Sequence, residues 1–251
     1  VIIACSAAAA KRRAASGPLL TAKRVLWIAA HPDDEIVPAP LLGRLCVEER
    51  ADCTFLVTTR GENGICALPG GCGDLGLVRV SEMRESAAIF GAALIQWTLP
   101  DAMNDVAQQW AATAGGREPL IGQIRDVIRS TTPDLIITFD PAHGTSCHPA
   151  HREIASLALE AAEGLAPVLL LETATRSGPA GYEFRNALPD RAWSFDGERG
   201  WDYSIRAASA HRSQFTPAAV DSLRATPASE RRVWVLPATA RGSGGYDVAC
   251  E

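Results

Sequence analysis

Short apolar runs alternate with helix-like segments along most of this 251-residue chain, starting near Lys23. The apolar runs predict strands at Arg24–Ala30, Cys53–Thr59, Leu94–Leu99, Asp134–Phe139 and Val168–Glu172. Apolar residues at helical spacing predict helices at Pro38–Glu49, Leu77–Phe90, Pro119–Ser130 and Pro149–Glu163. Continuous apolar strands separated by helices are typical of a mainly parallel sheet with helices on both faces. The pattern therefore predicts an α/β fold.

Three long stretches without clear periodicity interrupt this alternation, at Gly61–Gly76, Pro100–Glu118 and Thr175–Trp201. Each follows the end of a predicted strand, so we expect long loops that surround one binding site at the carboxyl ends of the strands. A helix at Asp202–Ser213 and a strand at Arg232–Pro237 complete the pattern. We predict one domain over residues 23–251, preceded by a leader or flexible segment at 1–22.

Charge and hydropathy argue against a nucleic-acid partner and against a membrane-spanning helix. The formal net charge is -5, and acidic and basic residues are interspersed without a basic block. This composition argues against a nucleic-acid partner. The sequence also has no apolar stretch of about 18 residues, the length that a membrane-spanning helix needs.

Seven cysteines are many for a protein of the reducing cytosol. Cys66 and Cys72 flank a Gly/Pro-rich turn and predict a small disulfide ring, and Cys46 and Cys53 are spaced to join a helix end to the next strand. The alternative is that several cysteines are small buried hydrophobic residues. Around Cys5 the chain resembles the cleavage end of a bacterial lipoprotein signal. We expect an exported or membrane-associated protein, with membrane-surface contact through the N-terminus; the alternative is a cytoplasmic one.

Four of the five histidines lie in two short clusters, each after an apolar run. His31 is followed by Pro32, Asp33 and Asp34, and Pro32 forces a turn there. We expect His31 and Asp34 to converge on a metal while Asp33 faces the substrate. In the second cluster Pro149 suits the first turn of a helix. This places His148 at the N-terminal end of that helix and His151 within its first turn.

Two histidines and one carboxylate leave coordination positions open for water and substrate, as catalytic zinc requires. A free carboxylate beside the metal is then available as general base, and another histidine as acid or oxyanion stabiliser. The two clusters therefore predict a hydrolytic zinc centre.

The same segments carry a family resemblance. The chain resembles the PIG-L/LmbE family at Ala30–Glu35, Thr59–Gly64, Arg79–Glu82, Thr138–Pro141 and His148–His151, with a weaker similarity at Ala210–Gln214. The resemblance implies a Rossmann-like fold and zinc-dependent deacetylation of N-acetylglucosaminyl groups. It makes His31, Asp34 and His151 the metal ligands, Asp33 the general base and His148 the electrophilic or acid histidine.

The resemblance also implies positions that face the substrate. Arg79 falls where relatives contact polar or phosphate groups, and the further predicted substrate-binding residues are Glu62, Asp140, His143 and His211. For each of these four a structural alternative stays open. Glu62, like Glu35, is expected to stabilise a turn or a ligand, and Asp140 to pair with a ligand histidine. His143 is otherwise a loop residue, and His211 a packed histidine.

Two positions depart from some relatives. Ala150 stands where a carboxylate lies between the two histidines, and Ser146–Cys147 stand where a tyrosine precedes the motif. The long loops carry Met103, Trp110, Tyr182, Phe184 and Trp193, which suggest a large and partly apolar substrate. Within the family this resembles deacetylases of teicoplanin-type glycopeptide antibiotics. The alternative is a small N-acetylglucosamine conjugate.

Two rival classes use similar residues. A non-haem iron oxygenase also has two histidines and a carboxylate, but its usual scaffold is all-β. A non-catalytic, metal-dependent glycan-binding protein would not require Asp33 beside the ligands, and its metal would be closed to solvent. The expected partner in every glycan interpretation is a glycoconjugate that contains N-acyl-glucosamine.

Overall fold

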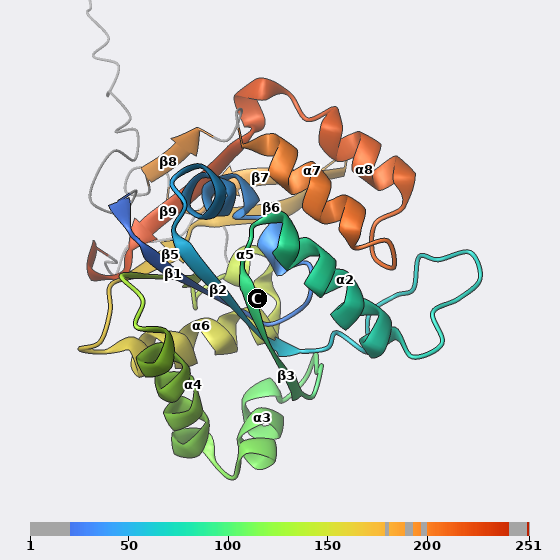
Figure 1. Ribbon diagram of the computed structural model, residues 1–251. Helices are drawn as coiled ribbons and strands as arrows, with labels where there is room; N and C mark the ends of the chain where they lie inside the picture. The colour runs from blue at the N-terminus through green and yellow to red at the C-terminus, as the bar shows by residue number, and fades with distance from the viewer. Residues whose placement is uncertain (1–20, 179–180, 189–192, 197–199, 241–249, 251) are drawn as a thin grey trace, which may run out of the picture.

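The computed structural model describes residues 21–178, 181–188, 193–196, 200–240 and 250. Its centre is a seven-stranded sheet in the order β3-β2-β1-β4-β5-β9-β8 (Figure 1). The strands are β3 (Ala93–Leu99), β2 (Asp52–Thr59), β1 (Arg24–Ala29), β4 (Leu135–Phe139), β5 (Val168–Leu171), β9 (Arg232–Pro237) and β8 (Trp193–Asp196). The first five run parallel; at one edge β9 pairs antiparallel with β5, and β8 pairs antiparallel with β9. The predicted α/β fold with a mainly parallel sheet is confirmed.

Strand β1 lies in the middle of the sheet, between β2 and β4. Its residues from Leu26 to Ala29 have no exposed surface, which explains why its sequence is apolar throughout instead of alternating. The order of the strands reverses between β1 and β4. In open α/β sheets, ligands bind outside the carboxyl ends of the strands at such a reversal. This is the point at which both histidine clusters emerge.

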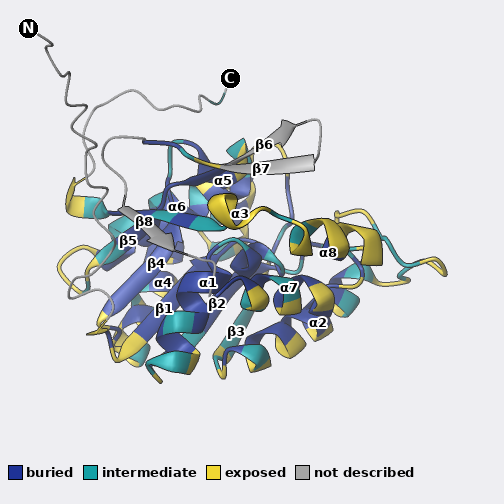
Figure 2. Cartoon of the chain, turned by 90° about the horizontal axis from the view of Figure 1, so that it is seen from above, coloured by how far each residue is buried: buried dark blue, intermediate teal, exposed yellow. Residues whose placement is uncertain are grey.

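Helices cover both faces of the sheet (Figure 1). One layer contains α1 (Ala39–Leu42), α2 (Leu75–Ile89), α7 (Trp201–Ala210) and α8 (Pro217–Arg224). The other contains α3 (Val106–Ala114), α4 (Arg117–Thr131) and α6 (Pro149–Ala162), with the short α5 (Gly144–Cys147) beside α6. Figure 2 shows the central strands buried and the outward sides of these helices exposed. Within the described residues, no helix has the length and apolarity needed to cross a membrane.

The predicted helix Pro38–Glu49 is split, because α1 continues as a π-helical segment at Gly43–Glu48. The predicted irregular stretch Pro100–Glu118 contains α3, which buries Val106 and Trp110 in the core. Too few apolar residues mark this short helix for its period to stand out in the sequence.

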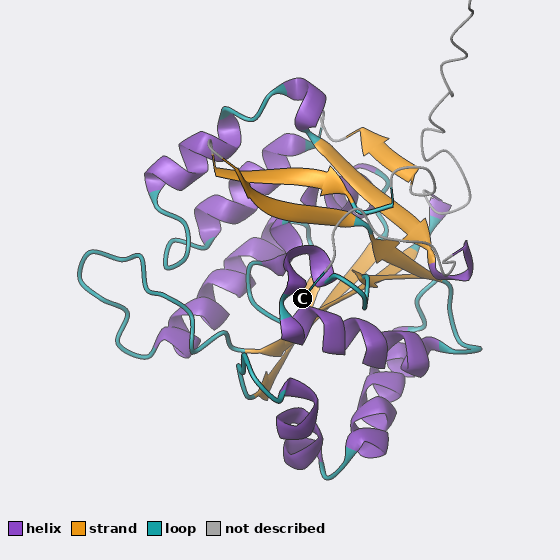
Figure 3. Cartoon of the chain, turned by 180° about the vertical axis from the view of Figure 1, so that it is seen from behind, coloured by secondary structure: helices purple, strands orange, loops and turns teal. Residues whose placement is uncertain are grey.

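A second difference lies in the predicted irregular stretch Thr175–Trp201. There β6 (Thr173–Gly178) pairs with β7 (Gly181–Asn186) in a separate two-stranded sheet, and β8 joins the main sheet. Only the loop after β2 remains irregular as predicted, and it projects from the body of the protein (Figure 3).

Three disulfides join six of the seven cysteines. Cys46–Cys53 and Cys66–Cys72 have the pairings that the sequence predicts. The third, Cys147–Cys250, was not predicted, and it ties the chain beside His148 to the C-terminal end. Cys5 and the predicted leader up to residue 20 lie outside the described residues.

Candidate metal centre

The first cluster forms a tight turn directly after β1. Asp34 Oδ2 accepts hydrogen bonds from the backbone N–H groups of Ala30 at 2.9 Å and His31 at 2.8 Å. Asp33 has φ 104°, a left-handed conformation that non-glycine residues seldom adopt. Such strain persists only where the surroundings enforce it, and it clusters at functional sites. The turn directs Asp33 and Asp34 differently, since their side chains are 20% and 6% exposed.

The second cluster begins helix α6, as predicted. Pro149 occupies the first turn, and His148 is the N-terminal cap, its Nδ1 accepting the backbone N–H of Ala150 at 3.2 Å. His151 lies three residues after His148. Its Nδ1 is 2.8 Å from the carbonyl oxygen of Gly144, so Nδ1 carries the proton and donates it there. Gly144 has φ +51°, and a side chain at this position would come within 2.8 Å of the His151 Cβ.

Three atoms from the two clusters converge. His151 Nε2 lies 2.9 Å from Asp34 Oδ1 and 3.1 Å from His31 Nδ1, and His31 Nδ1 lies 3.7 Å from Asp34 Oδ1. A tetrahedral zinc site with bonds of about 2.1 Å has ligand atoms about 3.4 Å apart. The three side chains are also nearly buried. The sequence-predicted ligand set is therefore brought together with the spacing that a metal ion requires.

The charges around His31 fit a dication. Burial by itself lowers the pKa of His31, but Asp34 and Asp101 outweigh it and raise the pKa to about 9. The carboxylates of Asp34 and Asp101 thus stabilise a positive charge at His31, whose ring also faces His151. A divalent ion at the converging atoms would supply that charge, since Asp34 and Asp101 together balance it. The residues present fit zinc, which takes nitrogen and oxygen ligands in this arrangement.

His148 differs from His151 in its hydrogen bonding. Its ring lies edge-on to that of His31, with centroids 4.6 Å apart, and stacks on that of His151, with centroids 4.8 Å apart. Because its Nδ1 accepts a backbone N–H, its proton lies on Nε2 when the ring is neutral. Burial, together with His31 and His151, lowers its pKa to about 4. His148 is thus a neutral hydrogen-bond donor beside the metal centre.

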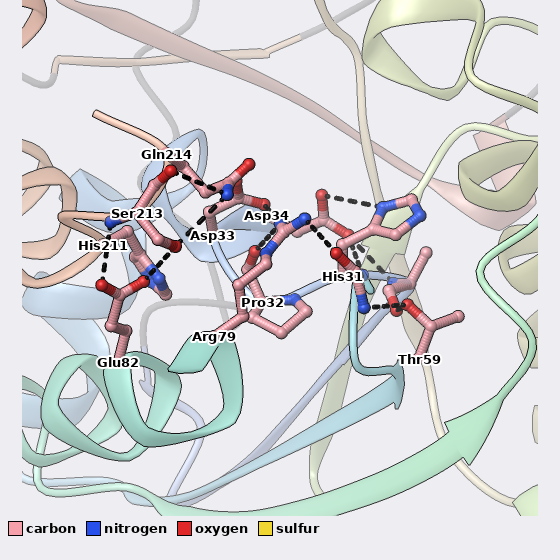
Figure 4. A network of polar contacts seen from close by, with 12 residues as sticks. His31, Pro32, Asp33, Asp34, Thr59, Arg79, Glu82, His211, Ser213 and Gln214 are labelled. Atoms are coloured by element: carbon pink, nitrogen blue, oxygen red, sulfur yellow. Dashed lines mark hydrogen bonds and ion pairs between the residues drawn. The ribbon is translucent and has the colours of Figure 1, made fainter. Parts of the chain in front are cut away.

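Arg79 lies on α2 and is buried beneath the first cluster (Figure 4). Its guanidinium contacts Asp33 Oδ1 at 3.0 Å and donates to the carbonyl oxygens of Gly61 and Pro32. Burial raises the pKa of Asp33 above its ordinary value, and Arg79 opposes that rise. The described contacts of Arg79 are thus with the protein itself, and they hold the Asp33 carboxylate in place.

His211 also supports the first cluster, from the C-terminal end of α7. It has no exposed surface, and its Nε2 lies 2.6 Å from Glu35 Oε1, which Ser86 Oγ also approaches at 2.5 Å. The other oxygen of Glu35 accepts the backbone N–H of Asp33 at 3.2 Å. Substrate contact by His211 stays a prediction, and its side chain has no accessible surface in the structure. The alternative, a packed histidine, agrees with this placement.

Asp140 and His143 are likewise enclosed, and substrate binding by either of them stays a prediction. His143 Nε2 lies 3.5 Å from Glu172 Oε2 and 4.0 Å from Asp140 Oδ1, and the three side chains are at most 1% exposed. His143 Nδ1 accepts the backbone N–H of Thr145, so its Nε2 carries the proton and does not suit a metal. Asp140 faces His143, and its predicted pairing with a ligand histidine stays a prediction.

Glu62 stabilises the neighbouring loop, since its Oε1 accepts the backbone N–H of Asp101 at 3.3 Å. Asp101 itself was missed in the sequence. Its Oδ1 lies 3.3 Å from His31 Nε2, and its pKa is lowered because the interaction with His31 outweighs burial. The sequence signal that could have identified Asp101 is its position directly after Pro100 at the end of β3, at the same edge of the sheet as His31.

Two of the predicted apolar loop residues, Met103 and Trp110, have described side chains. Trp110 is fully buried and its Nε1 donates to the Pro100 carbonyl, so it is a core residue. Met103 is 59% exposed on the loop after β3, and Ile65 is 87% exposed on the loop after β2. The side chains of Tyr182, Phe184 and Trp193 lie outside the described part of the structure.

The fold and the candidate metal centre define the class of protein. It has a Rossmann-like sheet, and two histidines and a carboxylate converge at the ends of the central strands. Residues 26–162 match the PIG-L family, described as GlcNAc-PI de-N-acetylase. The chain belongs to this family. This agrees with the resemblance seen in the sequence motifs.

A similar curated relative is the 1D-myo-inositol 2-acetamido-2-deoxy-alpha-D-glucopyranoside deacetylase of Gordonia bronchialis, 28% identical over 150 residues. The match covers 51% of this chain and 53% of the relative. The chain thus spans about half the length of the curated relatives it matches.

Solved structures confirm the fold. The N,N'-diacetylchitobiose deacetylase of Pyrococcus horikoshii has a TM-score of 0.64 at 20% identity, covering 88% of this chain and 86% of that one. The 4-carboxy-2-hydroxymuconate hydratase GalB of Pseudomonas putida has a TM-score of 0.62 at 16% identity, covering 88% and 99%. A deacetylase of teicoplanin biosynthesis has a TM-score of 0.56 at 18% identity, covering 86% and 98%. Because a hydratase shares the fold, the architecture alone does not fix the reaction.

Proposed function

We propose that this protein is a zinc-dependent hydrolase that removes the N-acetyl group from a glucosamine unit of a larger glycoconjugate. The observation that carries the proposal is the convergence of His31 Nδ1, His151 Nε2 and Asp34 Oδ1 beside the partly exposed carboxylate of Asp33. Membership of the PIG-L family and the deacetylase name of the Gordonia relative support the same reaction.

The roles of the residues follow from their positions. His31, Asp34 and His151 would hold the zinc, which supplies Lewis-acid polarisation of the amide carbonyl and of the attacking water. Asp33 accepts a proton from that water as the general base. Its raised pKa suits this task, because a base nearer neutrality accepts the proton more readily. Arg79 keeps the Asp33 carboxylate oriented.

His148 completes the set from the other cluster. As a neutral ring with its proton on Nε2, it donates a hydrogen bond to the carbonyl oxygen of the amide as negative charge develops there. Ser146 and Cys147, which precede His148, offer no phenol that would donate to the same oxygen, and Ala150 offers no carboxylate to pair with the histidine. In this chain His148 therefore takes the role of oxyanion donor.

Asp33 separates catalysis from the alternative of a non-catalytic glycan-binding protein. A metal that only shapes a binding surface requires no free carboxylate beside it. Here Asp33 is held in a left-handed conformation by contacts with Arg79 and Glu35. Backbone strain of this kind costs about 1–3 kcal/mol and is typical of functional positions.

The substrate is proposed only as a class. The Gordonia relative is named for a small glucosaminyl-inositol compound, which favours a compact conjugate. Exposed Met103 and Ile65 on the two rim loops favour an apolar aglycone, as in glycopeptide antibiotics. We further propose an exported or surface-associated enzyme, because three disulfides suit an oxidising compartment.

The test is release of acetate from three N-acetylglucosamine conjugates: an inositol glycoside, chitobiose and a glycopeptide pseudoaglycone. Acetate should appear with at least one of them, stop when a chelator removes the metal, and return when zinc is added. If the zinc-loaded protein binds these conjugates but releases no acetate, the glycan-binding alternative holds instead.

A further inference from the structure

Asp101 lies at the edge of the metal centre, two residues beyond the end of β3. Its Oδ1 is 3.3 Å from His31 Nε2. The other nitrogen of the same ring, Nδ1, faces His151 Nε2 at 3.1 Å and Asp34 Oδ1 at 3.7 Å. The two edges of the His31 ring thus point in different directions, one at the predicted metal position and one at Asp101.

The side of the ring that faces the metal must present a lone pair, because a nitrogen that carries a proton does not coordinate. If Nδ1 of His31 coordinates, its proton lies on Nε2. Nε2 makes no hydrogen bond within the described residues, and the Asp101 carboxylate, its ion-pair partner at 3.3 Å, is a strong acceptor for that N–H. A carboxylate in this position fixes the tautomer and orientation of a ligand histidine and makes it a stronger donor to the metal.

Asp101 is itself held firmly. Its Oδ2 accepts the backbone N–H of Asn63 at 2.9 Å, and the Asn63 side chain donates to the Asp101 carbonyl. Its own N–H donates to Glu62 Oε1. The carboxylate is therefore positioned from the loop after β2, independently of the first histidine cluster, and only 9% of the residue is exposed.

We propose that Asp101 is a positioning residue for the metal centre: it accepts the Nε2–H of His31, locks the ring in the tautomer that coordinates through Nδ1, and supplies the second negative charge that balances a dication. The proposal rests on the proposed zinc centre and assigns to it a residue that belongs to neither histidine cluster.

The test measures zinc affinity, by competition with a chelator, on the full chain with its disulfides intact. Asp101→Ala should weaken zinc binding by about 10–100-fold. Asp101→Asn keeps an acceptor oxygen but loses the charge, so its loss should be smaller. Asn63→Ala is the matched control, because it removes the side-chain contact with Asp101 and leaves the contact with His31. Circular dichroism of each variant verifies folding.

A second measurement determines directly which nitrogen of His31 carries the proton. Nitrogen-15 NMR of the zinc-loaded protein should show His31 protonated on Nε2, with that proton shifted downfield by the carboxylate, and Asp101→Asn should reduce the shift. Coordination through Nε2, or zinc affinity in Asp101→Ala equal to that of the native protein, overturns the proposal. An equal loss in Asn63→Ala also overturns it, since loop order would then be the cause. Failure of the native protein to bind zinc would instead refute the metal centre itself.

Discussion

The Nε2 atom of His151 lies 2.9 Å from Oδ1 of Asp34, while its Nδ1 is committed to the carbonyl oxygen of Gly144. One hydrogen bond therefore determines which nitrogen of His151 is free, and that nitrogen faces a carboxylate and a second histidine. His148, three residues earlier, has the opposite arrangement, because its Nδ1 accepts a backbone N–H. Two histidines on the same helix turn are thereby assigned to different tasks.

This difference predicts opposite effects on metal content. His151→Ala should abolish stoichiometric zinc binding, because it removes one of three ligands. His148→Ala is the matched control and should keep one equivalent of zinc while losing most of the turnover. Elemental analysis of the two purified variants measures the zinc content of each and tests which histidine is the ligand. Full zinc content in His151→Ala, or an empty His148→Ala, would contradict the assignment.

Asp33 and Asp34 are neighbours with different predicted roles. Asp33→Asn keeps the size of the side chain but does not accept a proton, so kcat should fall by about 10²–10⁴-fold with zinc retained. Asp34→Asn should instead weaken zinc binding, because an amide oxygen donates less charge to the cation. Turnover and zinc content are measured on the same preparations. A zinc-loaded Asp33→Asn enzyme with near-native turnover would rule out the general-base mechanism.

The sequence predicted the parallel sheet and the contact between the two histidine clusters for the same reason. Each cluster follows a mainly apolar strand, and parallel strands end at one edge. The roles of individual side chains within the clusters needed the hydrogen-bond partners. Nothing in the motif around His148 and His151 shows that the Gly144 carbonyl fixes one ring and the Ala150 N–H the other.

Residues outside the clusters were harder to place. Burial decides whether a polar residue can reach a substrate, and burial depends on long-range packing. His211 lies 176 positions from its partner Glu35, and His143 lies 29 positions from Glu172. Asp101 was missed because a single aspartate after a strand has no motif around it. Trp110 was assigned to a loop because its helix is short and contributes few apolar residues.

The disulfides predict the thiol count of the mature protein. Cys46–Cys53, Cys66–Cys72 and Cys147–Cys250 leave Cys5 as the one cysteine outside the described residues. Protein made in an oxidising compartment should show at most one free thiol when denatured. The long Cys147–Cys250 loop should contribute the most, about 4–5 kcal/mol, and the short rings about 2 kcal/mol each. Urea unfolding measures the loss of unfolding free energy in Cys147→Ser/Cys250→Ser and in the matching double serine variants of the two short rings. A larger loss when a short ring is removed would contradict the ranking.

The buried pair of His211 and Glu35 predicts a pH-dependent stability. Burial lowers the pKa of His211, but Glu35 outweighs it, and the pKa is raised above 6.5. Burial raises the pKa of Glu35, but His211 and Ser86 outweigh it, and that pKa is lowered below 4.5. The histidine contribution is complete below pH 6.5 and is lost as the pH rises through the folded pKa. The glutamate contribution is complete above pH 4.5 and is lost as the pH falls through its own.

The free energy of unfolding of the native protein minus that of His211→Gln should therefore be larger at pH 5.5 than at pH 9. Breaking a buried pair from one side costs about 3–5 kcal/mol, because a charge is left without a partner. Urea unfolding of metal-free protein with intact disulfides measures this difference. Arg212→Gln is the control next to it: its pair with Glu85 is 57% and 49% exposed, so its loss should cost less than about 1 kcal/mol at both pH values. Glu35→Gln combined with His211→Gln should recover part of the loss. A His211→Gln effect that stays constant between the two pH values would show that the histidine is buried neutral and that Glu35 is not its ionic partner.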